Sequence, residues 1–147
     1  MIPGNKNCPV RNIHWLEQAG STVDKNPLYA GGKKRRLLTT GLNGQVTEWD
    51  LCSGKIKHKF AAHAGVWDSC RFKTTANAKL MALACEDGSI KLVKIKKGEI
   101  VLQRTLSKIL GVRCLSLEIS ADDKFIWAGY SDGSIRKWDL EASNCIL

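Results

Sequence analysis

The sequence predicts an all-β protein built from three copies of one four-stranded unit. The first observation is a recurring pattern, in which a tight turn ending in glycine precedes a short apolar strand. The turn glycines Gly44, Gly88 and Gly133 stand 44 and 45 residues apart, and a period of this length marks a repeated supersecondary unit. The second observation is that no stretch keeps a helical hydrophobic period. Hairpins flanked by further strands at this spacing are typical of the blades of a β-propeller.

Each copy begins with a turn whose chemistry can be read directly. The turns carry Asn43-Gly44, Asp87-Gly88 and Asp132-Gly133. Asn, Asp and Gly are the residues that tolerate positive φ, so these pairs predict two-residue hairpin turns with positive φ at both central positions. The strand after the turn ends in Trp49-Asp50 in the first copy and Trp138-Asp139 in the third, whereas the second copy has Val93-Lys94.

The repeat divides the chain into three predicted blades. They cover about residues 10–60, 63–106 and 111–147, and the last is incomplete. Known propellers close with roughly four to eight blades. We therefore expect the chain to be part of a larger ring; the alternative is a short chain that associates with further copies or with another chain.

Strand patterns within the copies predict which side chains are buried. Residues 10–16 alternate as an innermost strand, with Ile13 and Trp15 in the interior and His14 pointing the other way. Residues 80–84 are nearly all apolar and predict a strand that is buried on both faces between neighbouring blades. Residues 20–36 contain Pro27, Gly31 and Gly32 and predict a long basic surface loop.

The composition favours an anionic partner. The net charge is +9, from 23 basic and 14 acidic residues. A dense basic run ends the predicted loop, and it is open to three interpretations: a nuclear-import signal, a phosphate-contacting loop or a solvated loop end. Two further basic residues each follow a turn glycine by three positions. The candidate nucleic-acid contacts are Lys33, Lys34, Arg35, Arg36, Lys91 and Arg136.

The remaining patterns argue against catalysis, metal and cofactors. The six cysteines form no Cys-x-x-Cys pair, and those within apolar strands predict reduced thiols in a reducing compartment. The acidic residues lie in turns or at strand ends, and no glycine-rich phosphate loop occurs. No segment predicts a signal peptide or a membrane span. We therefore expect a soluble intracellular protein that is not an enzyme and has no small-molecule substrate.

The chain resembles the WD-repeat family at these motifs. Trp49-Asp50 and Trp138-Asp139 are the residues that name that family, and Asp87-Gly88-Ser89-Ile90 and Asp132-Gly133-Ser134-Ile135 follow its turn pattern. The resemblance implies that His63 bonds Asp87 and connects to a Ser/Thr and a Trp, although Val93 replaces the Trp in that blade. The structural blade motif it implies comprises Asn43, Gly44, Trp49, Asp50, His63, Asp87, Gly88, Asp132, Gly133, Trp138 and Asp139.

An ordered set of blocks over about residues 10–147 is similar to the cirhin-type proteins within that family. The most specific blocks are Thr47-Glu48-Trp49-Asp50 and Cys85-Glu86-Asp87-Gly88. This resemblance implies a scaffold subunit of the small-subunit processome in the nucleolus, with other WD-repeat and helical subunits and pre-ribosomal RNA as partners. The alternative is a peptide-binding adaptor such as a ubiquitin-ligase substrate receptor. Those adaptors often carry Arg two residues after Trp-Asp, where this chain has Cys52 and Glu141.

Overall fold

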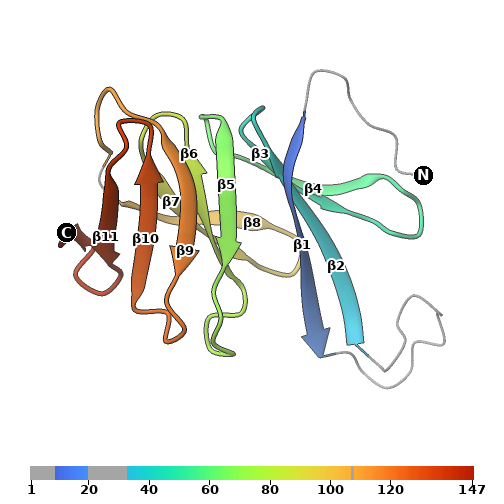
Figure 1. Ribbon diagram of the computed structural model, residues 1–147. Helices are drawn as coiled ribbons and strands as arrows, with labels where there is room; N and C mark the ends of the chain where they lie inside the picture. The colour runs from blue at the N-terminus through green and yellow to red at the C-terminus, as the bar shows by residue number, and fades with distance from the viewer. Residues whose placement is uncertain (1–8, 20–32, 107) are drawn as a thin grey trace.

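A computed structural model describes residues 9–19, 33–106 and 108–147 of the 147-residue chain. Within these residues the chain forms twelve β-strands in three four-stranded antiparallel sheets that lie side by side (Figure 1). The described residues contain no helix, and so none that could cross a membrane. The sheets follow one another along the chain without closing into a ring, which confirms the prediction of an all-β, partial propeller of about three blades.

Each sheet consists of four strands that are consecutive in sequence, and we call the sheets the first, second and third blade. The first contains β1 (Val10–Ala19), β2 (Lys33–Gly41), β3 (Gln45–Trp49) and β4 (Ile56–Ala61). The second contains β5 (Val66–Arg71), β6 (Leu80–Cys85), β7 (Ile90–Ile95) and β8 (Ile100–Leu106). The third contains β9 (Cys114–Ile119), β10 (Phe125–Tyr130), β11 (Ile135–Asp139) and the short β12 (Asn144–Cys145).

The three blades share one strand register. The innermost strands β1, β5 and β9 each skip one residue in their pairing at the same place, opposite the end of the second strand. This common bulge fixes which residues are equivalent between blades. Two sets of equivalent positions matter below: Arg36, Leu80 and Phe125 on the second strands, and Glu48, Leu92 and Lys137 on the third strands.

The turns between the second and third strands differ from the prediction at one central position. Only the glycines have positive φ, 72° at Gly44 and 81° at both Gly88 and Gly133. Each glycine N–H donates to a carbonyl three residues earlier, at 3.0 Å, which is a type I turn followed by a left-handed glycine. The preceding Asn or Asp does not have a positive φ, and its side-chain oxygen stabilises the turn by accepting a hydrogen bond from the N–H two residues on.

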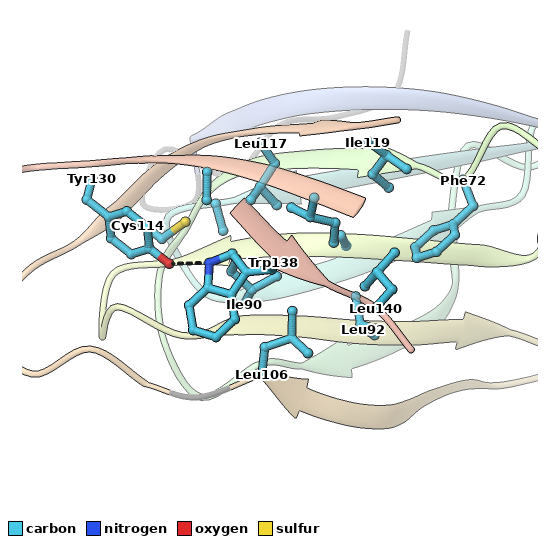
Figure 2. Close-up of a cluster of buried hydrophobic side chains, with 14 residues drawn as sticks. Phe72, Ile90, Leu92, Leu106, Cys114, Leu117, Ile119, Tyr130, Trp138 and Leu140 are labelled. Atoms are coloured by element: carbon cyan, nitrogen blue, oxygen red, sulfur yellow. Dashed lines mark hydrogen bonds between the residues drawn. The ribbon is translucent and has the colours of Figure 1, made fainter. Parts of the chain in front are cut away.

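Two apolar clusters join the blades, and β6 lies between them. Met81, Leu83 and Cys85 face the first blade, whereas Ala82 and Ala84 face the third, and all five are fully buried. This burial confirms the prediction of a strand covered on both faces. Figure 2 shows the cluster between the second and third blades, in which Trp138 Nε1 donates to the Tyr130 hydroxyl at 3.2 Å.

The prediction for β1 buries the wrong face of the strand. Ile13 and Trp15 are 64% and 49% exposed, whereas Leu16 is buried and His14 is half-buried against the second blade. The physical reason is the position of β1 at the flank of the array. Only one of its faces is covered by a neighbouring blade among the described residues, and alternation alone does not say which face that is.

The predicted loop over residues 20–36 is also corrected at its end. Lys33, Lys34, Arg35 and Arg36 belong to β2 and pair with Ala19 to Leu16 of β1. The ladder hydrogen bonds of this long hairpin stabilise an extended backbone where composition alone suggested a loop. Residues 20–32 lie outside the described residues.

Candidate nucleic-acid interface

Arg36 was predicted to contact phosphate, but its guanidinium is buried at the contact of the first and second blades. Its Nε and Nη2 donate to the two carboxylate oxygens of Glu48 at 2.7 and 2.5 Å, and Nη2 also donates to the Lys96 carbonyl. Burial acts to raise the pKa of Glu48, but the hydrogen bonds and charge of Arg36 outweigh it and lower that pKa below its usual value. Arg36 therefore neutralises a buried carboxylate, and its assignment as a phosphate-contacting residue is wrong.

Lys91 and Arg136 occupy equivalent positions and both engage groups of their own chain. Lys91 Nζ donates to the carbonyl of Ala62, in the connection from the first blade. The Arg136 guanidinium lies 4.9 Å from the Tyr130 ring centroid and 3.2 Å from an Asp132 oxygen. Any phosphate bound by these residues would compete with those partners, so their role in nucleic-acid binding stays a prediction.

The start of β2 carries the remaining predicted contacts. Arg35 is exposed. The side chains of Lys33 and Lys34 lie outside the described residues. Their role in binding nucleic acid also stays a prediction.

The two Trp-Asp pairs each combine an anchoring side chain with a turn cap. Trp49 Nε1 donates to Thr39 Oγ1 at 2.9 Å, and Trp138 Nε1 donates to the Tyr130 hydroxyl, two positions further along the second strand than the equivalent of Thr39. Asp50 accepts the Cys52 N–H at 2.9 Å, and Asp139 accepts two backbone N–H groups at 2.8 Å. The Trp thus holds the second and third strands together, and the Asp closes the turn that leads to the fourth strand.

The bond from His63 to Asp87 that the family pattern implies is not formed. His63 is exposed with a φ of 58°, and the described residues offer it no hydrogen bond to Asp87. Asp87 instead accepts the Ser89 N–H and hydroxyl and lies 3.6 Å from Lys108 Nζ. Since Val93 fills the Trp position of this blade, the network lacks the group on which it would end.

A polar network that the sequence did not predict joins the innermost strands of all three blades. His14 Nε2 lies 2.8 Å from Ser69 Oγ, which in turn lies 2.9 Å from Thr40 Oγ1. Asp68 accepts from Asn12 Nδ2 at 2.9 Å with one oxygen and from the Leu117 N–H at 2.9 Å with the other. The only signal in the sequence is that Asn12 and His14 share strand parity with the buried Leu16.

This network does not form a nucleophilic site. Ser69 is 4% exposed and already shares its hydroxyl with Thr40, and both oxygens of Asp68 bind groups other than His14. Nucleophilic catalysis needs an accessible hydroxyl and a base that a third group orients. Among the residues that the structure describes, no group of three or more His, Cys, Asp or Glu side chains is placed to hold a metal ion.

The contact of the second and third blades is closed at one end by a carboxylate. Asp123, which is buried and has a φ of 58°, accepts the Lys73 and Thr74 N–H groups at 2.7 and 2.9 Å and Asn77 Nδ2 at 3.2 Å. Burial acts to raise the pKa of Asp123, but these hydrogen bonds outweigh it and lower that pKa. The β9–β10 turn thereby holds the β5–β6 loop in place.

A cleft of about 690 Å³ opens between the first and second blades beside that same loop. Its walls come from the end of β1, the start of β2 and residues 75–80, and include Leu16, Arg36 and Leu80. Figure 1 shows the β5–β6 loop at the end of the molecule toward which β1 runs. Lys79 and Lys94 line the cleft, and none of the described lining residues is a carboxylate.

Comparison with known proteins finds, among other relatives, one protein that aligns with this chain in three organisms. No protein-family model matches the chain. U3 small nucleolar RNA-associated protein 4 of Schizosaccharomyces pombe is 33% identical over 120 residues, and that of Saccharomyces cerevisiae 31% over 145. The Homo sapiens homolog is 30% identical over 113 residues. These alignments cover 76–98% of this chain, which spans only 16–17% of the length of these relatives.

A solved structure gives independent support for the fold. The β-propeller domain of Cps50 (Swd1) from Myceliophteria thermophila matches with a TM-score of 0.62 at 20% identity, covering 76% of this chain and 37% of that one. Together with the three sheets, their common register and the Trp-Asp geometry, these similarities confirm the resemblance drawn from the sequence. The chain belongs to the WD-repeat β-propeller family.

Proposed function

We propose that the chain is a non-enzymatic scaffold segment in small ribosomal subunit biogenesis, acting in pre-ribosomal RNA processing within the small-subunit processome. One observation carries this proposal: relatives named for association with U3 small nucleolar RNA align with most of the chain in two yeasts and in human. U3 small nucleolar RNA-associated protein 12 of Saccharomyces cerevisiae also aligns with 99% of the chain, at 22% identity.

The packing of the blades and the net charge of the chain support a scaffold role. Apolar clusters and buried polar contacts fix the blades against one another, so the exposed turns and strand edges form one stable surface. A net charge of +9 attracts RNA through its phosphates. Under this proposal the partners are other processome subunits and pre-ribosomal RNA, and the location is the nucleolus.

The test is to express the tagged chain in its own cells and measure the RNA that co-purifies with it. We expect enrichment of U3 small nucleolar RNA over a spliceosomal RNA of similar abundance, together with nucleolar fluorescence. The matched control is the Trp138→Ala variant, which loses a buried side chain and should lose both signals. A folded wild-type chain that is diffuse in the cytoplasm and carries no U3 RNA would contradict the proposal.

A further inference from the structure

The cleft between the first and second blades is positively charged, although Arg36 in its wall is neutralised. Lys79 and Lys94 both line it and are exposed, and no carboxylate lies within ion-pair distance of either among the described residues. Other lysines are paired: Lys57 with Glu48 at 3.7 Å, Lys96 with Glu99 at 3.1 Å. The two lysines therefore face a concave space with their charges unbalanced.

The walls of this cleft suit a flexible polyanion. The cleft has a volume of about 690 Å³. Leu16 and Leu80 give apolar contact, and Gln103 supplies an amide. Among the described residues no aromatic side chain lines the cleft, so this part of the lining offers ammonium groups for phosphates and no ring on which a base could stack.

The positive charge of the described lining comes from Lys79 and Lys94, since Arg36 is paired with Glu48. Two separate ammonium groups in one cleft suit a chain of regularly spaced charges better than a single anion.

We propose that this cleft, with Lys79 and Lys94 as its contact residues, binds the phosphate backbone of single-stranded RNA without sequence selectivity. The identification of RNA as the polyanion rests on the function proposed above. The contacts are to phosphate, because the described lining residues carry ammonium groups and include no base-stacking ring.

The experiment measures binding of a fluorescent 12-nucleotide oligouridylate to the full chain across a salt series. Each phosphate contact to a single strand contributes about −0.7 to the slope of log affinity against log salt. We expect the double variant Lys79→Gln, Lys94→Gln to make this slope less negative by about 1.4, because it removes two contacts. If the wild type and the variant bind equally at 1 M salt, this change makes the affinity of the variant about 25-fold lower at 0.1 M salt. All four lysines substituted in this variant and its control are exposed, and thermal unfolding checks that each protein is folded.

The matched control is the double variant Lys59→Gln, Lys124→Gln, which removes the same charge from exposed sites outside the cleft. We expect it to keep the wild-type slope. Equal slopes for the wild type and both variants, or an equal change in both variants, would overturn the assignment of the cleft. A 12-residue polyglutamate that competes with RNA at equal affinity would overturn the choice of RNA as ligand.

The outcome for the cleft can be separated from that for the proposed function. If the cleft variant keeps the wild-type RNA slope while the chain still co-purifies U3 RNA from cells, the cleft proposal fails and the scaffold function stands. A second outcome is that the wild-type chain co-purifies no U3 RNA from cells, while the cleft variant binds oligouridylate more weakly than the wild type. The scaffold function then fails and the cleft remains a polyanion site.

Discussion

The two contacts between blades use the same positions but different chemistry. Where the first blade meets the second, Arg36 and Glu48 form a buried ion pair. The equivalent Leu80 and Leu92, where the second blade meets the third, pack into an apolar cluster. The innermost strands differ in the same way, because β1 and β5 share a polar network whereas Leu117 and Ile119 of β9 pack in that apolar cluster.

This difference shows that the shared register fixes where a side chain points and leaves its chemistry open. Apolar burial is non-directional and tolerates modest changes of shape, whereas a buried ion pair needs both partners in place. We therefore expect the two contacts to respond differently to truncation, to replacement of a pair and to pH.

The largest effect is expected from truncating the apolar contact. Trp138 is 2% exposed at the centre of the cluster in Figure 2. Trp138→Ala should lower the free energy of unfolding by about 3–5 kcal/mol, through lost burial and the cavity that remains. Urea denaturation measures this loss in the free energy of unfolding. The control is Trp127→Ala in the same blade, since Trp127 is 38% exposed. Equal losses in the two variants would contradict the assignment of the core.

The polar contact should be sensitive to loss of one partner and tolerant of loss of both. Glu48→Leu leaves the Arg36 charge buried and should cost about 3 kcal/mol, because the remaining acceptor is the Lys96 carbonyl. The double variant Arg36→Leu, Glu48→Leu copies the second blade and should unfold within about 1 kcal/mol of the wild type, since apolar replacements of buried ion pairs are often neutral. Urea denaturation of Arg36→Leu, Glu48→Leu and the double variant gives the coupling free energy between the two side chains. If the losses in unfolding free energy of the two single variants add up to that of the double variant, Arg36 and Glu48 do not stabilise the contact as a pair.

The turn glycines sharpen the comparison because Gly44 and Gly88 lie beside the connections between blades, whereas Gly133 does not. A Cβ at Gly44 would come within 2.6 Å of the Ala64 carbonyl oxygen, and one at Gly88 would meet the carbonyls of Ile109 and Val112, whereas Gly133 faces open space. Gly133→Ala should cost about 1 kcal/mol for its left-handed backbone alone. Gly44→Ala and Gly88→Ala should each cost about 2–3 kcal/mol because backbone must also move. Melting temperatures that fall equally in all three variants would contradict this account.

The repeat made the blades predictable, but the contacts between them were not. Turn glycines and the apolar run of β6 depend on local chemistry, and both were located from sequence. The parity of β1 was missed because Ile13 and Trp15 are more apolar than His14, yet only the face bearing His14 meets another blade. From the sequence, Arg36 is indistinguishable from a surface charge. The β2–β3 hairpin places its partner Glu48, 12 residues away in sequence, beside it.

The smallest expected effect is the pH dependence that His14 gives to the polar contact. Burial, reinforced by the charge of Arg71 and opposed by that of Asp68, lowers the pKa of His14 below its ordinary value of 6.5. The unfolded chain therefore takes up a proton at higher pH than the folded chain does, so the stability that neutral His14 contributes is present above pH 6.5 and is lost as the pH falls through the folded pKa. The wild type should unfold at a lower urea concentration at pH 5.5 than at pH 7.5. His14→Gln should reduce that difference, whereas the exposed His63→Gln should keep it. An unchanged difference in His14→Gln would show that protonation does not disturb the contact of the first and second blades.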